Sequence, residues 1–397
     1  MTIEIVYHDG RFTLSPTHSL TDGQAQYAQT YLDRASRYQV IAHYHGSPVF
    51  SLYQPPLAST VGARSLTMRL ARATAGVRIP ATATLSVTKA CQCECGHCSA
   101  VFYNHAKHKA LSTSDLQAAI TQTVALGATT IILLGGEPLL HTDLDALITS
   151  VPPEQATVIL FTNGEYLTAS RCARLKEAGL FGAFISLDSP DEIEHDRYRQ
   201  RPGIFQKAVA GIANLKSAGL LAGISSYLSP DRLQEGVFGH IMQLGKDLGV
   251  HEVTFFDAIP SGRWLRDESQ ILKSVDRNYI RTMVRQYRAL RHYPGLSVQS
   301  TLTSDCGSAF CFAANTQFYL TAWGDMCPCD FTPITVGRFP DEPIATLWEK
   351  MITAVPYRDR TKACRMQDPG FRRRYIDAIP PEGPYPYPLD LLNASVR

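Results

Sequence analysis

The chain has 397 residues, of which 45% are apolar and 19% are charged, so it can bury a large core and is not disordered. Its 38 basic and 36 acidic side chains nearly balance. This argues against nucleic acid as a partner, because duplex binding relies on a concentrated positive field. No apolar run reaches the roughly 18 residues of a membrane span, and the N-terminus lacks the basic start and apolar stretch of a secretory signal. We expect a cytoplasmic protein of two or three domains, at about 150 residues per domain.

The first 80 residues are expected to form a small N-terminal α+β cap domain (1–80). His8-Asp9-Gly10 predicts a hairpin turn, because Asp-Gly favours the tight turns that join two antiparallel strands. The elements expected here are strands at 3–7 and 11–14 on either side of that turn, a helix near 24–38, and strands at 39–44 and 48–53.

The next 220 residues (81–300) alternate short apolar strands with amphipathic stretches that end at glycines suited to helix C-caps, such as Gly127 and Gly179. Strands that alternate with helices of this length indicate βαβ units and a parallel sheet. Six units are too few for the closed eight-stranded barrel, so we predict an α/β fold with a partial (β/α)6 barrel. The expected strands lie at 82–88, 129–134, 157–161, 183–188, 221–227 and 252–256.

Cysteine is the most informative residue type. The chain has ten cysteines; nine lie in two groups, at 91–98 and 306–364, and Cys172 stands apart. In a chain without export signals, clustered cysteines more often hold a metal than form disulfides. Zinc and an iron–sulfur cluster both remain open at this point.

The first cysteine group begins where the first strand of the expected sheet ends, which is where loops build sites in α/β proteins. It contains Cys91, Cys95 and Cys98 in the spacing Cys-x-x-x-Cys-x-x-Cys. A closed zinc site or a fully ligated cubane needs four ligands. Three cysteines on one short loop can instead hold three irons of a [4Fe–4S] cluster and leave the fourth open to a small molecule. A zinc site that adds Cys93 or His97 is the alternative.

A second motif, Gly135-Gly136-Glu137-Pro138, ends the second strand. Two glycines let a ligand approach the backbone closely, while Glu137 adds an acceptor and Pro138 stiffens the turn. In isolation this segment is equally well explained as a tight turn. Its position one βα unit after the three-cysteine loop favours a shared site.

In order and spacing, these motifs resemble the radical S-adenosylmethionine (radical SAM) superfamily over about residues 82–260. The matching segments are the three-cysteine loop, the Gly-Gly-Glu-Pro segment, Thr162-Asn163-Gly164, and Ser186-Leu187-Asp188 followed by His195-Asp196-Arg197. The resemblance implies an enzyme whose [4Fe–4S] cluster binds SAM at its open iron. The residues implied are Cys91, Cys95 and Cys98 as cluster ligands, and Gly135, Gly136, Glu137 and Ser186 as contacts to SAM.

The resemblance also implies the reaction. An electron from a reductase, a flavodoxin or a ferredoxin cleaves SAM, and the resulting deoxyadenosyl radical abstracts hydrogen from a substrate carbon. Cys93 departs from the family, which has no ligand at that position of the loop. We therefore predict that Cys93→Ala keeps the cluster, whereas Cys95→Ala loses it.

The second cysteine group lies in the C-terminal part of the chain (301–397), where a turn at Gly324-Asp325 is expected to bring Cys329 back towards Cys311. A zinc ribbon is one interpretation of this convergence. The stretch also resembles the SPASM or twitch extension of radical SAM enzymes, which implies one auxiliary [4Fe–4S] cluster. The implied ligands are Cys306, Cys311, Cys329 and Cys364, with Cys327 left as a doubtful fifth cysteine.

The substrate is open between two classes. One is a ribosomal peptide that is matured by crosslinking, epimerisation or decarboxylation, as in many SPASM-type relatives, and the other is a small metabolite. A zinc-stabilised binding protein without catalysis is a remote third hypothesis. Elsewhere, Arg372, Arg373 and Arg374 are expected on a solvated helical face.

Overall fold

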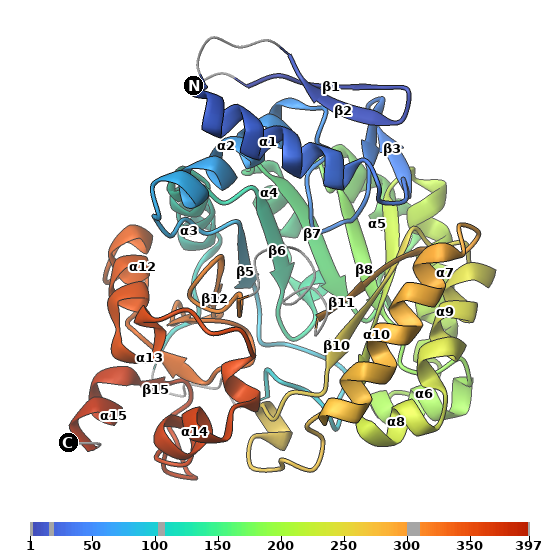
Figure 1. Ribbon diagram of the computed structural model, residues 1–397. Helices are drawn as coiled ribbons and strands as arrows, with labels where there is room; N and C mark the ends of the chain where they lie inside the picture. The colour runs from blue at the N-terminus through green and yellow to red at the C-terminus, as the bar shows by residue number, and fades with distance from the viewer. Residues whose placement is uncertain (1–2, 16–19, 102–107, 300–309, 396–397) are drawn as a thin grey trace.

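The computed structural model describes residues 3–15, 20–101, 108–299 and 310–395. Its centre is one sheet, and the strand order in the described chain is β11-β10-β9-β8-β7-β6-β5-β12-β13 (Figure 1). All neighbours from β11 to β12 run parallel, and β13 pairs antiparallel with β12. The strands are β5 (Thr82–Ser86), β6 (Thr130–Leu134), β7 (Thr157–Thr162), β8 (Gly182–Ser186), β9 (Leu221–Leu228), β10 (Glu252–Asp257), β11 (Gly295–Val298), β12 (Gln317–Leu320) and β13 (Met326–Cys327).

The six predicted strands, β5 to β10, are consecutive neighbours in this sheet, which confirms an α/β fold with a parallel sheet. The sheet is nevertheless larger than predicted, because β11 adds one parallel strand at one edge and β12–β13 extend the other edge. The strand β12 comes from the C-terminal part of the chain and pairs with β5, so this part continues the central sheet.

Helices cover one side of the sheet (Figure 1). Each follows its strand because the chain must return to start the next parallel strand. The helix α3 shows how local sequence sets the limits: a capping box joins Ser112 to Asp115 at its start, and Gly127, with φ +118°, ends it in the left-handed region. The helices here are α3 (Thr113–Leu126), α4 (Leu144–Thr149), α5 (Ala169–Glu177), α6 (Glu192–Arg199), α7 (Ile204–Ser217), α8 (Pro230–Gln234), α9 (Val237–Asp247) and α10 (Ser274–Ala289).

The two faces of the central strands differ in polarity. In β5, Ala83 and Leu85 belong to the main hydrophobic core, whereas Thr82, Thr84 and Ser86 face a cavity. The same alternation holds in β6, where the core residues are Ile131 and Leu133. Because successive side chains of a strand point to opposite faces, one face packs on helices and the other lines a partly polar hollow.

The N-terminal part packs against the sheet on the hollow side. Leu52 and Tyr53 lie in a cluster with Phe161 and Phe184 of the central strands. The amide N–H of Leu52 donates to the buried carboxylate of Glu252, at the start of β10, at 2.7 Å. The elements are β1 (Ile5–His8), β2 (Arg11–Leu14), α1 (Asp22–Ala35), β3 (Ala42–Tyr44), β4 (Ser47–Val49) and α2 (Thr60–Thr74), of which α2 was not predicted.

The C-terminal part lies on the other flank, where α12 packs against α3. One prediction fails here: Arg372 is buried, pairs with Glu268 and donates to the carbonyl of Leu265 at 2.7 Å. No helix in the described ranges has the length and apolar character needed to cross a membrane. The elements are β14 (Ile334–Thr335), α12 (Ile344–Thr353), α13 (Val355–Arg358), α14 (Pro369–Phe371), a π-helical turn at Arg372–Ile376, β15 (Tyr387–Pro388) and α15 (Leu389–Ser395).

Candidate active site

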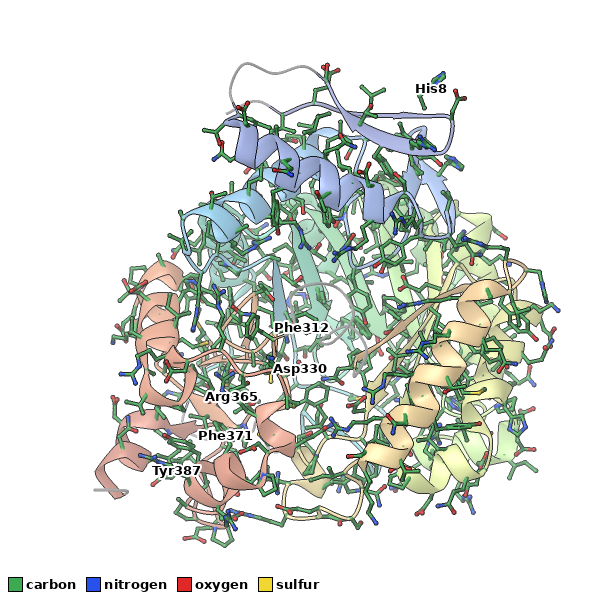
Figure 2. The ribbon with its side chains drawn as sticks, in the orientation of Figure 1. His8, Phe312, Asp330, Arg365, Phe371 and Tyr387 are labelled. Carbon is green, nitrogen blue, oxygen red and sulfur yellow. The ribbon has the colours of Figure 1, made fainter. Side chains whose placement is uncertain are left out.

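A cavity of about 1050 Å³ lies over the polar face of the central strands. Cys91, Cys95, Cys98, the Gly135–Glu137 segment and Ser186 all line it, so it brings together every predicted residue of the first site. The N-terminal helices and the C-terminal part also contribute to its walls. Figure 2 shows Phe312 and Asp330, two of the C-terminal lining residues, near the middle of the molecule.

The three thiols of the predicted cluster site differ in exposure. Cys91 is exposed, Cys98 is half-buried, and Cys95 is buried. The hydrogen bond with the Cys93 thiol lowers the pKa of Cys95 to about 6, and the guanidinium of Arg199 acts in the same direction. Thiolates are soft ligands that suit iron–sulfur clusters and zinc, and a lowered pKa favours the ligating form. Burial raises the pKa of Cys98, so the fit of this donor set to a [4Fe–4S] cluster rests on three thiols of one loop that line the same cavity.

Cys93 lies between the neighbouring thiols. Its thiol is within hydrogen-bond reach of both Cys91 and Cys95, and its backbone N–H points to the sulfur of Cys91 at 3.5 Å. The side-chain amide of Asn163, just after β7, is 3.7 Å from the Cys93 sulfur. The family has no ligand at this position of the loop, and the structure gives this thiol partners on both sides.

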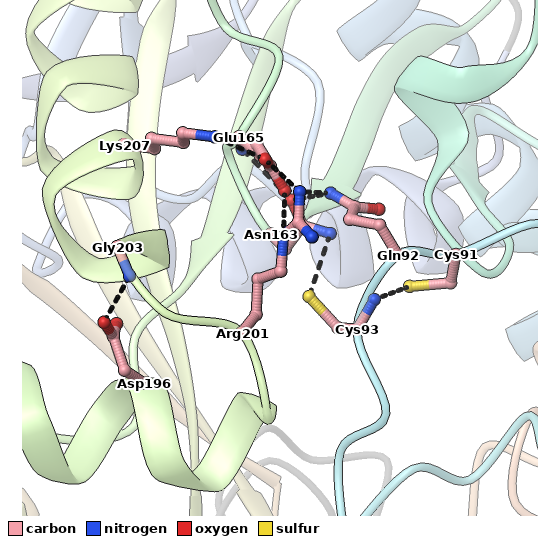
Figure 3. A network of polar contacts seen from close by, with 9 residues as sticks. All are labelled: Cys91, Gln92, Cys93, Asn163, Glu165, Asp196, Arg201, Gly203 and Lys207. Atoms are coloured by element: carbon pink, nitrogen blue, oxygen red, sulfur yellow. Dashed lines mark hydrogen bonds and ion pairs between the residues drawn. The ribbon is translucent and has the colours of Figure 1, made fainter.

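A polar network holds the cysteine loop against the segment after β7 (Figure 3). Gln92 donates to the Asn163 side chain at 3.2 Å and to the Glu165 carboxylate at 2.7 Å. Arg201 and Lys207 form ion pairs with the same carboxylate. Although burial acts in the opposite direction, hydrogen bonds from Arg201, Lys207 and Gln92 lower the pKa of Glu165 to about 2. Glu165 is therefore charged at neutral pH and anchors the loop.

Gly135 and Gly136 are required by backbone packing. A Cβ atom at Gly135 would lie 2.3 Å from the carbonyl oxygen of Thr88, and one at Gly136 would lie 2.4 Å from that of Ala90. The close approach lets Gly136 N–H donate to Thr88 and Glu137 N–H donate to Ala90, each at 2.8 Å. The two glycines thus join the second loop to the start of the cysteine loop.

The carboxylate of Glu137 is buried and uses both oxygens within the protein. Oε1 accepts from the Leu139 amide at 3.0 Å and from the Thr162 hydroxyl at 2.6 Å, and Oε2 accepts from the Asn163 amide at 2.8 Å. Burial raises the pKa of Glu137 to about 7 against these hydrogen bonds. In this arrangement the side chain ties the Gly-Gly-Glu-Pro segment to the end of β7 while it lines the cavity.

Arg199 is a cavity residue that sequence reasoning missed. Its guanidinium pairs with Asp188 at 2.7 Å and lies 3.7 Å from the sulfur of Cys95. Its backbone carbonyl accepts from Glu94 N–H at 3.2 Å, which fixes α6 to the cysteine loop. No signal in the sequence separates Arg199 from its neighbours Arg197 and Arg201, since only the fold brings it beside a cysteine.

His97, the alternative zinc ligand, lies between aromatic rings. Its ring centroid is 4.5 Å from that of Tyr227 and 6.1 Å from that of Trp264, and its Nε2 is 3.7 Å from Asp188. Burial lowers the pKa of His97 to about 4, so the imidazole is neutral at pH 7. Nearby, Gly262 lets Arg263 N–H donate to the carbonyl of Cys98 at 3.3 Å, because a Cβ there would overlap that oxygen at 2.0 Å.

The second cysteine group forms a smaller cavity of about 180 Å³ lined by Cys311, Cys329 and Cys364. Cys364 shares a hydrogen bond with Cys311, which lowers the pKa of Cys311 to about 6. Cys327 packs elsewhere, fully buried with aromatic neighbours, and Cys306 lies outside the described residues. Within the described ranges, no three His, Cys, Asp or Glu side chains form a tight group of the kind that holds a single metal ion.

The chain is similar to known proteins over most of this site. The radical SAM superfamily model matches residues 85–229. An AdoMet-dependent heme synthase of Nitratidesulfovibrio vulgaris is 25% identical over 292 residues, covering 66% of this chain and 77% of the relative. An AdoMet-dependent heme synthase of Methanosarcina barkeri is 27% identical over 290 residues, with coverage of 66% and 80%.

Two solved structures share the fold. Streptococcus suis SuiB bound to precursor peptide SuiA has a TM-score of 0.57 and 13% identity, covering 87% of each chain. Native anSMEcpe with bound AdoMet has a TM-score of 0.53 and 16% identity, covering 70% of this chain and 82% of that one. From these similarities the chain is an enzyme that works with a [4Fe–4S] cluster and SAM, and its residues 85–229 are similar to the radical SAM superfamily.

Proposed function

We propose that Cys91, Cys95 and Cys98 hold the [4Fe–4S] cluster and that Gly135, Gly136, Glu137 and Ser186 lie against SAM. When bound, these groups supply a deoxyadenosyl radical able to remove hydrogen from a substrate carbon. The proposal is supported by the one cavity that all seven residues line and by the thiolate character of Cys95.

The protein's own contribution is positioning. The Glu165 network and the Gly136–Thr88 hydrogen bond fix the cysteine loop, so the three thiols are held before any ligand binds. Arg199 places a cation beside Cys95, and its charge is balanced by Asp188. Asp188, Glu137 and Cys95 are buried, so the inner wall of the site is removed from water, whereas Cys91 is exposed at its outer side.

The C-terminal cysteines are proposed to hold one auxiliary [4Fe–4S] cluster, in a SPASM- or twitch-like domain (301–397) that follows the cap (1–80) and a partial barrel (81–300). Cys311, Cys329 and Cys364 line one small cavity, which supports three of the four ligands, and Cys306 is the fourth. Cys364→Ala should remove about four of roughly eight irons per chain. Cys327→Ala is the matched control and should keep them; equal iron loss in both variants would contradict this assignment.

The substrate proposed first is a ribosomally made peptide. The observation that carries this is the cavity of about 1050 Å³, whose walls come from the N-terminal helices, the central sheet and the C-terminal part. This volume is at the upper end of the roughly 300–1,000 Å³ that ligand pockets usually span, which suits a large substrate. SuiB, which shares the fold, is described with a bound precursor peptide, and anSMEcpe is described with a bound peptide.

A second candidate is an iron tetrapyrrole, a small-molecule substrate. The curated relatives named as heme synthases favour it, since they cover about two thirds of this chain. A tetrapyrrole would also fit in a cavity of this size. The two candidates share the radical chemistry and differ in what occupies the rest of the cavity.

The experiment that tests the proposal is anaerobic reconstitution with iron and sulfide, followed by incubation with SAM and dithionite. Wild type should bind iron and sulfide and release deoxyadenosine. Cys95→Ala should lose about four irons and this activity, whereas Cys172→Ala, a buried cysteine outside both groups, should keep both. A colourless wild-type protein with zinc and no labile sulfide would refute the enzyme proposal. The same assay distinguishes the two substrate classes. Stimulation of deoxyadenosine release by a peptide encoded beside the gene would support the peptide, and stimulation by iron-coproporphyrin would support the tetrapyrrole.

A further inference from the structure

The cavity has a second end, opposite the cysteine loop. Thr82 and Thr130, the first residues of β5 and β6, line it there, whereas the cysteine loop follows the last residue of β5. A strand of five residues spans roughly 16 Å at about 3.3 Å per residue. Groups at the second end therefore contact a part of the substrate distant from the reacting carbon.

This second end is formed by two helices of the N-terminal part and is basic and aromatic. Tyr27 and Tyr31 of α1 line the cavity with Arg69 and Arg72 of α2. The other described lining residues from this part of the chain are uncharged: Tyr53, Gln54, Pro55, Ser65 and Ala73. No described carboxylate from α1 or α2 lines the cavity; Asp330, from the C-terminal part, is a lining carboxylate whose charge acts on Tyr53.

Both arginines are held in place and carry charge at neutral pH. The guanidinium of Arg69 lies 4.3 Å from the ring centroid of Tyr31, a cation–π distance. Arg72 donates from Nη1 to the carbonyl of Ile79 at 3.1 Å. Burial, and then the nearby charge of Arg69, lower the pKa of Arg72 to about 10, which still leaves it protonated at pH 7. Among the described residues Arg72 has no carboxylate partner.

Two like charges on adjacent turns of one helix repel each other, and partial burial increases the cost. An anion in the cavity removes that cost. A carboxylate fits best, because the planar guanidinium fork matches its two oxygens. Arg360, from the C-terminal part, adds a third cation to the same cavity, held 5.7 Å from the ring centroid of Phe310.

We infer that Arg72, together with Arg69, binds a carboxylate of the substrate at the end of the cavity opposite the cysteine loop. This deepens the proposed function, because it requires only that the substrate occupies this cavity. The shared chemistry is a carboxylate on a part of the substrate distant from the reacting carbon. It can come from an acidic side chain or the C-terminus of a peptide, or from a propionate of a tetrapyrrole.

The experiment measures probe binding to the reconstituted protein with SAM by calorimetry. One arm uses a capped synthetic hexapeptide with two glutamates and its glutamine counterpart. The other arm uses hemin and its dimethyl ester. In at least one arm the acidic probe should bind more tightly than its neutral partner. Arg72→Gln should lower the affinity for the acidic probe by roughly tenfold or more and leave the affinity for the neutral probe unchanged. The arm that responds identifies the source of the carboxylate.

Two further variants make the test decisive. Arg34→Gln changes an exposed arginine of α1 that does not line the cavity, so it should bind the acid as wild type does. Arg72→Lys keeps the charge and should recover part of the affinity. Equal affinity of wild type and Arg72→Gln for both acids, or an equal loss in Arg34→Gln, would overturn the inference. Iron content and deoxyadenosine release, measured on the same preparation, report separately on the proposed function.

Discussion

Gly136→Ala is the substitution whose effect follows most directly from the structure. The added methyl group would lie 2.4 Å from the carbonyl oxygen of Ala90 and 2.5 Å from that of Lys89. Both contacts are with backbone atoms, which cannot rotate away as the end of a side chain can. The two loops must therefore move apart by about 1 Å to reach the 3.4 Å at which contacts become ordinary.

The cost can be worked from the contacts that this movement breaks. The hydrogen bonds from Gly136 N–H to Thr88 and from Glu137 N–H to Ala90, both 2.8 Å, would be lengthened beyond useful range. At about 1 kcal/mol for each bond and about 1–3 kcal/mol for the overpacking itself, the total is about 3–5 kcal/mol. Because Ala90 precedes Cys91, the strain falls on the loop that is proposed to hold the cluster.

The assay is iron and sulfide per chain after anaerobic reconstitution, together with the denaturant midpoint of the apo protein. Gly136→Ala should lose about four irons and unfold at a lower denaturant concentration. Gly23→Ala is the matched control, since a Cβ at Gly23 meets no atom within 4 Å. A Gly136→Ala protein with the wild-type iron content and midpoint would show that the loops adapt without cost, and the packing argument would then be wrong.

Three other predictions use the same iron and unfolding assays. Cys93→Ala should keep the cluster iron and Cys95→Ala should lose about four irons, and equal loss would contradict the ligand assignment. Glu165→Gln should weaken cluster retention. The pKa of Glu165 is about 2 in the folded protein, so its ionised carboxylate stabilises the fold at any pH above the ordinary pKa of a glutamate, and this stabilisation is lost as the pH falls towards 2. The stability of the variant should therefore depend less steeply on pH in acid. Glu137 has a pKa raised to about 7, so wild-type stability should fall as pH rises from about 4.3 to 7, a slope that Glu137→Gln should lack. If stability fell with pH equally in wild type and in Glu137→Gln, the pKa of Glu137 would not be raised in the folded protein.

The sequence predicted the sheet well because each central strand alternates between a helix-packed core face and the cavity face. The helix α2 was not predicted, although Leu66 and Leu70 follow helical spacing. These two side chains pack on the N-terminal hairpin and α1, a partner that no local pattern reveals. Arg372 was misplaced for a similar reason. Its donors are satisfied by carbonyl groups from the loop after β10, a distant segment that only the fold brings near.

At the site, the residues that could be predicted were those that recur at fixed intervals along the sequence. The cysteines and the two glycines could be found because backbone geometry and shared ligands fix their intervals along the chain. Arg199 and the Arg69–Arg72 pair could not, because Arg199 contacts Cys95, which is 104 residues away, and because only the fold brings α2 to the cavity. Even for the glycines, the reason given from the sequence was incomplete: the close approach that the structure reveals is between two protein loops.

The contact between the N-terminal part and the sheet has a practical consequence for dissecting the enzyme. Glu252 is buried at the start of β10, and its oxygens accept from Leu52, Ser51 and Ser297. Truncation before residue 81 would remove two of these three donors and uncover Phe161 and Phe184. A carboxylate left unmatched in an apolar setting costs several kcal/mol. The N-terminal part is thus an integral support of the sheet, and truncated chains that omit it are poor starting points for mechanistic work.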